Sequence, residues 1–564
     1  MTARSASILL AIVVWLCFAV QVAGIVWASS RGLELTDESY YLLSAIYPEQ
    51  VTLYISAQHW ILGPLWQLTE NLQGFRLTGA AILVGSAAVL TLGATRAFTH
   101  LTGGHGATPV AKGMTIAASG IGALLYVVTI APSPSYNLLG SSGAYAGFGF
   151  ALLSLNRSRW ALQVFYAGLG GAALAVCFVC KPSAGLSVGL VTLLVVLALE
   201  RRPRKWAICA MGVISALGAV MLMVALQPRG ASVIESLRGG LDLFRMVQTE
   251  PVMDRLIRYC ITLMTSFAKS LGAFGLVVLL VILSWRYPRR WLFALTLLVW
   301  ILNLYANHSF LAGSTALVRM AEAIYILIFV IVALGLRGAA YPKQAKLLLG
   351  ALLSLPFAAT IGTGNALFTQ VIVALAPWTV GAALLSFGSS SKLQTIPLQW
   401  GATGLLLILL AAQTTTSYLR DPYHLAAPLI AQTETVILAP LGTIKVDPQT
   451  DLFLKQIAKA KQTCALVPGG AYFGLFNLPG LALTLGLVPP VTPWVNNSDQ
   501  AAKVLQHWSP HQYNRIVIAL STEAQATPSL VPAILRPVPN GYLFCGRATV
   551  PYESQVIEIW ASPK

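Results

Sequence analysis

Two adjacent carboxylates, Asp37 and Glu38, follow the first long apolar segment in a chain with only 19 acidic residues among its 564. A third carboxylate, Glu34, lies just before them. Charged groups beside a bilayer are costly, and they usually pair, bind or react. Neighbouring side chains on a helix point about 100° apart, so one carboxylate can face a cleft while the other holds a cationic or metal partner. The alternative is structural, with Thr36 or Asp37 capping a short exposed helix.

Two basic residues lie where the chain meets apolar segments. Arg76 heads the second apolar segment, and Lys181 stands between two further ones, directly before Pro182. No room is left for a soluble loop around Lys181, and a proline interrupts a helix at that point. Each side chain could hold an anion at the membrane surface. The alternatives are that Arg76 anchors its helix at the interface and that Lys181 extends its amine to the headgroups.

The composition indicates that membrane helices position these charged residues. Hydrophobic residues make up 56% of the chain and charged residues 10%, with a mean hydropathy of +0.72, whereas soluble proteins carry about 25% charged residues. This balance is typical of an α-helical polytopic membrane protein. The formal charge of +17 comes from short loops between apolar segments, so it indicates anionic lipid headgroups rather than nucleic acid.

The apolar segments predict thirteen membrane helices, at about 20 residues per span. The first segment is too long and wrongly flanked for a signal peptide, so we expect it to remain as a helix. The predicted helices are 8–28, 77–97, 113–131, 138–155, 161–180, 184–199, 207–226, 262–284, 291–306, 318–336, 347–361, 366–388 and 399–413.

Clusters of Arg and Lys in the short loops alternate onto one side, which the positive-inside rule identifies as the cytoplasm. This topology puts the N-terminus inside, and it puts the loops near 29–76 and 227–261, and everything after about 413, outside. Both loops mix apolar or aromatic residues with charges, as expected of helices that lie in the interface.

Four more residues belong to the outer face in this topology. Tyr136 and Asn137 follow two prolines, which is typical of a turn. His59 and His308 could bind a metal, although neither has a partner at metal-ligand spacing.

The residues after 413 follow a different pattern. Short apolar runs alternate with helical stretches, which indicates a small extracytoplasmic α/β domain over 414–564, after a transmembrane domain over 1–413. It shows no phosphate-binding loop. Cys464 and Cys545 fall within it, where a disulfide is possible. The expected strands are 435–439, 464–467, 515–520 and 556–560, and the expected helices are 448–461, capped by Asp447, and 498–507.

Three short motifs carry a family resemblance: Leu-Glu-Leu-Thr-Asp-Glu-Ser-Tyr-Tyr at 33–41, Phe-Arg-Leu at 75–77 and Lys-Pro at 181–182. In this topology the chain resembles the GT-C superfamily of integral-membrane glycosyltransferases. It is closest to the branch of protein O-mannosyltransferases and lipid A aminoarabinose transferases, which share its layout of helices, outer loops and C-terminal domain. The chain departs from that branch after the acidic pair, where Ser39-Tyr40-Tyr41 replaces the usual histidine-containing triplet. No metal-binding histidine therefore carries over.

The resemblance implies transfer of a sugar from a polyprenyl-phosphate donor to an extracytoplasmic lipid, glycan or protein, in the inner membrane of a bacterium. Asp37 would be the general base, and direct attack would invert the anomeric carbon. Glu38 would orient Asp37 or bind a divalent cation, the one candidate cofactor. Lys181 and Arg76 would stabilise the departing phosphate. Further candidates are Tyr40, Tyr136 and Asn137 for substrate contacts, and His59 and His308 as metal ligands beside Glu38.

Three other functions fit a basic polytopic chain. A transporter or lipid flippase would bury ionisable residues within its spans and show internal repeats. Here they gather at one face, with Glu322 near the tenth helix as the main exception. A surface-polysaccharide polymerase or ligase would share the GT-C layout, and a sensor or assembly protein would work through its C-terminal region.

Overall fold

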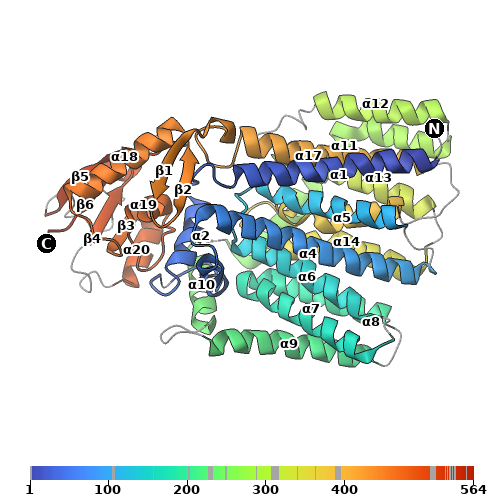
Figure 1. The fold of residues 1–564 in the computed structure, drawn as a ribbon, viewed down its shortest axis with the longest axis horizontal. Coiled ribbons are helices and arrows are strands. Elements are labelled where there is room, and N and C mark those ends of the chain that lie inside the picture. Colours follow the sequence, from blue (N-terminus) through green and yellow to red (C-terminus); the bar gives the residue numbers. More distant parts are fainter. Residues whose placement is uncertain are drawn as a thin grey trace.

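A computed structural model gives a bundle of long helices lying side by side, with the strands and short helices of the C-terminal residues gathered at one end (Figure 1). The N-terminus lies at the opposite end of the bundle from the C-terminus. The expected fold class, an α-helical membrane protein with a small C-terminal sheet region, is confirmed. The structure describes residues 3–563 apart from 52, 104–107, 156–157, 201–203, 227–232, 248–249, 288, 307–316, 339–340, 363, 388–395, 509–515, 528, 530, 532–534, 536–537, 539–540 and 554.

All thirteen segments expected to be membrane helices are helical, but the twelfth is broken. It consists of α15 (Leu367–Gln370), a 3-10 helix η3 (Val371–Ala374) and α16 (Ala376–Phe387), with a bend of 70°. Pro377, the second residue of α16, explains the break, because proline has no N–H to bond to the preceding turn and its ring clashes with that turn. The other twelve are α1 (Ala3–Ala28), α4 (Leu72–Leu101), α5 (Pro109–Leu124, continued by the 3-10 helix η1, Leu125–Val128), α6 (Tyr136–Ser154), α7 (Trp160–Cys180), α8 (Pro182–Leu199), α9 (Lys205–Ala225), α11 (Val252–Arg286), α12 (Arg290–Ala306), α13 (Leu317–Gly338), α14 (Lys343–Thr360) and α17 (Ile396–Arg420).

The described helices make the chain a multi-pass membrane protein. Eight of them are long and apolar enough to cross a bilayer, or nine if the bent pair counts as one span. Helices α12 and α13 contain shorter apolar stretches, Trp291–Ala306 and Met320–Leu336. Thirteen therefore stays a predicted number of spans, although the predicted helices themselves are present.

Glycines let α4 and α6 pack closely, and this contact matters because Arg76 and Tyr136 lie at the starts of these two helices. A Cβ atom added at Gly93 would lie 2.2 Å from the carbonyl oxygen of Gly149, and one at Gly149 would lie 2.7 Å from backbone atoms of Leu90. Any side chain at these positions would push the helices apart. The close packing fixes the relative positions of two helix starts that contribute to the site.

The two long outer loops contain the helices expected there. The first loop forms α2 (Asp37–Ile46) and α3 (His59–Gln67), and the second forms α10 (Val233–Val247). The loops touch each other: the indole N–H of Trp60 donates to Ser236 Oγ at 3.2 Å. Residues 227–232, at the start of the second loop, lie outside the described residues.

The C-terminal residues form two sheets. Strands β1 (Glu434–Leu438) and β2 (Gly442–Val446) make an antiparallel pair. The second sheet has the order β3-β4-β6-β5, with β3 and β4 parallel and the other pairs antiparallel. Its strands are β3 (Ala471–Leu475), β4 (Ile516–Leu520), β5 (Leu543–Thr549) and β6 (Val556–Ala561), and the helices beside it are α18 (Pro448–Thr463), α19 (Pro479–Leu485), α20 (Ser498–Gln506) and α21 (Thr522–Ala526).

Most of the expected C-terminal elements are present, and Asp447 caps α18 by accepting from the backbone N–H groups of Gln449 and Thr450. The strand expected at 464–467 is wrong, because α18 runs to Thr463 and the chain then turns. Cys464 forms a disulfide with Cys545, and Ala465 has a positive φ of 44°. The last long helix is also longer than expected, since α17 continues past 413 to Arg420.

Backbone hydrogen bonds join the C-terminal region to the first outer loop. Gly32 N donates to Lys445 O at 2.8 Å, and Lys445 N donates to Ser30 O at 2.8 Å. Gly480 N donates to Leu35 O at 2.8 Å, and a Cβ atom at Gly480 would lie 2.6 Å from the Leu35 backbone. The segment that leads into Asp37 is therefore held by residues more than 400 positions later in the chain.

Candidate functional site

The N-terminus of α2 is capped by Glu34, which leaves Asp37 free of that role. Glu34 accepts from the backbone N–H of Thr36 at 2.7 Å and from that of Glu38 at 2.5 Å. The Thr36 side chain makes no capping hydrogen bond to the helix; its hydroxyl donates to Glu34. The structural alternative, with Thr36 or Asp37 as the cap, is therefore wrong, because a third carboxylate satisfies the free N–H groups instead.

Glu38 and Arg76 form a fully buried ion pair with two hydrogen bonds. Arg76 Nε donates to Glu38 Oε1 at 2.7 Å, and Arg76 Nη2 donates to Oε2 at 2.5 Å. Their side chains are 2% and 0% exposed. Ser133 also donates to Glu38 Oε1 at 2.5 Å. Glu38 thus ties the first turn of α2 to the start of α4 and to the segment before α6.

The other donors of Arg76 are also occupied by protein acceptors. Arg76 Nη1 donates to the carbonyl oxygens of Ser29 at 3.1 Å and Arg31 at 2.7 Å, and Nη2 donates to that of Gly32 at 3.0 Å. With the two bonds to Glu38, all five N–H groups of the guanidinium are used. This geometry corrects the expectation that Arg76 binds phosphate. It also removes Glu38 from the candidate metal ligands.

Asp37 differs from its neighbour in being partly exposed, at the first position of α2. Its Oδ2 accepts a hydrogen bond of 2.8 Å from the hydroxyl of Tyr423, a residue just after α17. Burial raises the pKa of Asp37, while the bond from Tyr423 and the nearby His424 oppose that rise. A carboxylate with a raised pKa and an accessible side chain is suited to accept a proton.

Tyr423 and His424, which follow α17, contact the residues at the start of α2. The His424 ring stacks on Tyr423 with 3.7 Å between ring centroids, and His424 Nδ1 lies 2.9 Å from the Thr36 hydroxyl. The same nitrogen lies 3.7 Å from Glu34 Oε1. Neither residue was a candidate from the sequence, although the polar run Asp-Pro-Tyr-His at 421–424, directly after the last apolar segment, is a signal that could have drawn attention.

Tyr136 lies beside Asp37 at the start of α6. The two side chains are close enough to interact electrostatically. Its backbone N–H donates to Gln58 at 2.8 Å, and its ring packs edge-on against Tyr41 at 5.8 Å. The side chain remains partly exposed. Tyr136 therefore keeps a place among the substrate-contact candidates.

Tyr40 has a structural role instead. It is 3% exposed, and its hydroxyl accepts from the backbone N–H of Ile55 at 2.8 Å. Its ring contacts those of Tyr54 and Trp494, with centroids 5.9 and 5.4 Å away. The expectation that Tyr40 contacts substrate is corrected, because its ring and hydroxyl are both used in packing the first outer loop against the C-terminal region.

Lys181 is buried within the protein, with a side chain that is only 7% exposed. It occupies the break between α7 and α8, and its Nζ donates to Asn137 Oδ1 at 3.3 Å and to Thr360 O at 3.5 Å. Among the described residues, no carboxylate lies within ion-pair distance of this amine. The burial argues against an amine that merely extends to the headgroups, and it leaves a positive charge that an anion could compensate.

A series of neighbouring groups connects the carboxylate of Asp37 to the amine of Lys181. Asp37 acts electrostatically on Tyr136, Asn137 follows Tyr136 at the start of α6, and Asn137 accepts from Lys181. The carboxylate and the amine thus each interact with a residue of the first turn of α6, Asp37 with Tyr136 and Lys181 with Asn137.

The described residues offer no group of three His, Cys, Asp or Glu side chains that could hold a metal ion. His59 is 4% exposed and lies 3.2 Å from Ser236 Oγ through its Nε2. Burial lowers the pKa of His59 to about 4, so it is neutral at neutral pH. His308 lies outside the described residues. Within the described residues, Asp37 and Glu38 therefore belong to no such group.

The chain matches no protein-family model and no curated protein sequence. Its structure resembles that of ArnT, the lipid A aminoarabinose transferase of Cupriavidus metallidurans, bound to undecaprenyl phosphate, with a TM-score of 0.41, 13% identity and coverage of 99% of this chain and 98% of that one. The apo state of the same protein gives a TM-score of 0.40 at the same identity and coverage.

An oligosaccharyltransferase of Archaeoglobus fulgidus, in complex with Zn and sulfate, gives a TM-score of 0.45 and 11% identity, with 94% of this chain and 71% of that one covered. Both proteins are GT-C glycosyltransferases. The function proposed next rests on the site itself.

Proposed function

We propose that this chain is a glycosyltransferase that moves a sugar from a polyprenyl-phosphate donor to a hydroxyl group of an acceptor outside the cytoplasm. One observation carries the proposal: a partly exposed carboxylate, Asp37, and a buried amine, Lys181, which has no carboxylate partner among the described residues, interact with neighbouring residues at the start of α6. Glycosyl transfer from a phosphate needs one base and one cation, and this arrangement supplies both.

The reaction is a direct displacement at the anomeric carbon. The acceptor hydroxyl oxygen attacks that carbon while Asp37 takes its proton, and the bond between the anomeric carbon and the phosphate oxygen breaks. The electron pair of that bond leaves on the polyprenyl phosphate. A single displacement with one carboxylate as base inverts the configuration of the anomeric carbon.

Tyr423 would hold Asp37 for this step. Its hydrogen bond fixes Oδ2 of the carboxylate, so Oδ1 is the oxygen that we assign to the acceptor proton. Burial raises the pKa of Asp37, which strengthens it as a base relative to a carboxylate in water. Tyr136, partly exposed beside Asp37, would line the sugar side of the site.

Lys181 would stabilise the phosphate as negative charge develops on the leaving oxygen. Its Nζ hydrogen bonds to Asn137 and Thr360 are long, at 3.3 and 3.5 Å, and an ammonium group has three donors. The amine can therefore turn toward a phosphate without leaving an acceptor of a strong bond unsatisfied. The lipid chain of the donor would lie in the bilayer beside the apolar helices.

The distribution of Lys and Arg in the loops places the Asp37 end of the bundle on the extracytoplasmic side in this proposal. The N-terminus would then lie in the cytoplasm of a bacterium. The acceptor would then approach between the first outer loop and the C-terminal residues. No step of the proposed reaction uses a metal ion.

The test is a transfer assay with the full chain in vesicles that contain a panel of polyprenyl-phosphate-linked sugars. Release of polyprenyl phosphate by the wild-type chain, and its loss in D37N, would support the proposal. Movement of the intact donor across the bilayer without its cleavage would identify a flippase and overturn it.

A further inference from the structure

Helix α4 carries a second arginine at its other end. Arg76 lies near the start of α4 and Arg96 near its last turn. At about 1.5 Å per residue the two are about 30 Å apart along the helix, which matches the thickness of the hydrocarbon core of a bilayer. Arg96 therefore marks the membrane surface opposite the one at which Asp37 lies.

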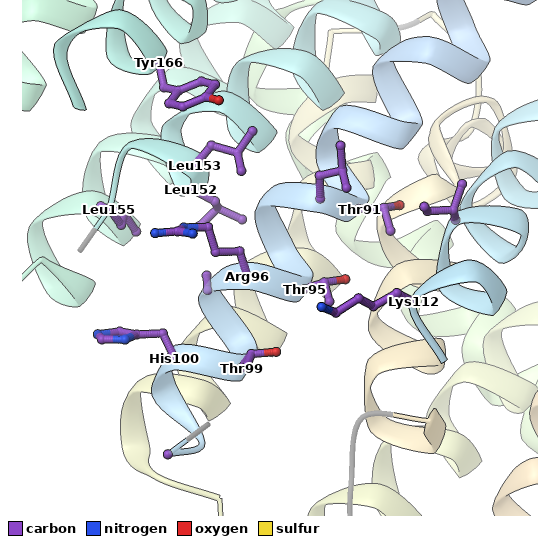
Figure 2. A pocket seen from close by; sticks show the side chains of 14 residues that line it. Thr91, Thr95, Arg96, Thr99, His100, Lys112, Leu152, Leu153, Leu155 and Tyr166 are labelled. Carbon is purple, nitrogen blue, oxygen red and sulfur yellow. The ribbon is translucent and has the colours of Figure 1, made fainter. Parts of the chain in front are cut away.

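A cavity of about 860 Å³ opens beside Arg96, between α4, α5, α6 and α7. Figure 2 shows its lining, with Arg96 and His100 extending from α4 and Lys112 extending from α5 toward Thr95. The described residues of the lining include these three basic side chains and no Asp or Glu. Apolar residues such as Leu92, Ile116 and Leu153 complete the walls. The cavity thus combines positive charge with apolar surface.

One polar group in the lining has no partner among the residues that the structure describes. Thr95 is 7% exposed, and its Oγ1 makes no hydrogen bond to any of them. Thr91, one turn earlier, shows the usual arrangement, because its Oγ1 donates to the carbonyl oxygen of Ala87 at 2.9 Å. A buried hydroxyl without a partner lowers stability, so Thr95 points to a ligand that accepts its hydrogen bond.

We propose that this cavity, defined by Arg96, Lys112 and Thr95, binds the phosphate headgroup of an anionic membrane lipid from the leaflet opposite the Asp37 site. The lipid is favoured because Leu92, Arg96 and His100 lie one turn apart on one exposed face of α4. Acyl chains would lie along Leu92, which is 51% exposed, with the phosphate at the level of Arg96. Basic pockets between membrane helices commonly bind such headgroups.

This binding site is separate from the proposed glycosyl transfer, since none of its lining residues belongs to the Asp37 site. It is tested with the full chain in nanodiscs of phosphatidylcholine, with and without phosphatidylglycerol, by native mass spectrometry of the lipids that remain bound. The double variant R96Q/K112Q should retain phosphatidylglycerol about thirtyfold more weakly, on the order of fivefold for each charge removed. The matched control K205Q/K343Q removes two basic residues at the starts of α9 and α14, outside the cavity, and should bind as the wild type does.

A second variant, T95V, tests the proposal even if the double variant R96Q/K112Q fails to fold. T95V conserves shape and removes the unpartnered hydroxyl, so it should raise the unfolding temperature in pure phosphatidylcholine and reduce the extra stabilisation by phosphatidylglycerol. Equal losses of binding in the double variant and its control would indicate attraction to surface charge in general and overturn the proposal. Protection of the wild type by inorganic phosphate as strong as by phosphatidylglycerol would also overturn it, because the ligand would then be a soluble anion.

Discussion

The hydroxyl of Tyr423 donates a hydrogen bond of 2.8 Å to Oδ2 of Asp37, across 386 positions of the chain. The residue that follows the last long helix thus holds the first residue of α2. This bond leaves one oxygen of a partly exposed carboxylate for a substrate proton. It also distinguishes Asp37 from Glu38, whose two oxygens are occupied by Arg76 and Ser133.

Replacing Asp37 with Asn should lower transfer at least ~100-fold, because the amide cannot accept a proton from the acceptor at neutral pH. Folding should be unaffected, since the Asn oxygen can still accept the bond from Tyr423 and the cap is provided by Glu34. The measurements are transfer activity and the amount of folded protein in the membrane. D242N is the matched control, because that carboxylate is exposed on α10. Full activity in D37N would remove Asp37 as the base.

Replacing Tyr423 with Phe should shift the acid limb of the pH-rate profile to higher pH. The bond from Tyr423 opposes the rise in the pKa of Asp37, so its loss raises that pKa further, and the ionised base is then lost at a higher pH as the solution is acidified. Y552F serves as control, since the exposed Tyr552 ring contacts His424 but not Asp37. A lower rate with an unchanged profile would mean that Tyr423 acts on packing alone.

Replacing Arg76 with Met should destabilise the protein by about 3–5 kcal/mol, the usual effect of removing one partner of a buried ion pair. Arg76→Lys should also be harmful, because a lysine cannot reproduce the two parallel bonds to Glu38. Thermal unfolding without donor measures both, and R547M at the exposed pair with Glu558 should be nearly neutral. Wild-type stability in R76M together with weak donor binding would restore the phosphate-binding role.

Replacing Lys181 with Met should weaken binding of a polyprenyl-phosphate donor about tenfold or more, the usual worth of a hydrogen bond to a charged group. Without donor, the unfolding temperature should not fall, because the substitution removes a buried charge that no described carboxylate compensates. Donor retention on purified protein is the measurement, with K205M as control. Unchanged retention would return Lys181 to a purely structural role in the break between α7 and α8.

Local patterns predicted the elements well, because apolar segments and caps depend on neighbouring residues. The thirteen helical segments and the Asp447 cap of α18 are examples. The strand expected at 464–467 failed because a short apolar run cannot be assigned from its pattern alone. Here the disulfide of Cys464 and the turn at Ala465 decide the local structure.

The partners of the site residues were harder to predict, because they are distant in sequence. The spacing of Asp37 and Glu38 indicated that one of them would hold a cation, and Arg76 was a candidate on the same face. No local pattern indicated that Glu38 and backbone carbonyl oxygens would occupy all the N–H groups of Arg76. The caps and contacts provided by Glu34, Ser133 and Tyr423 arise from the way distant segments pack.

The backbone bonds from Gly32 to Lys445 and from Gly480 to Leu35 also affect how the protein is made. All the long helices are translated before these partners, because Lys445 and Gly480 come after α17. The segment around Asp37 is therefore made without these contacts, and it gains Tyr423 and the sheet region only after α17 has been made. A chain interrupted after α17 would lack the backbone bonds that hold the segment leading into Asp37.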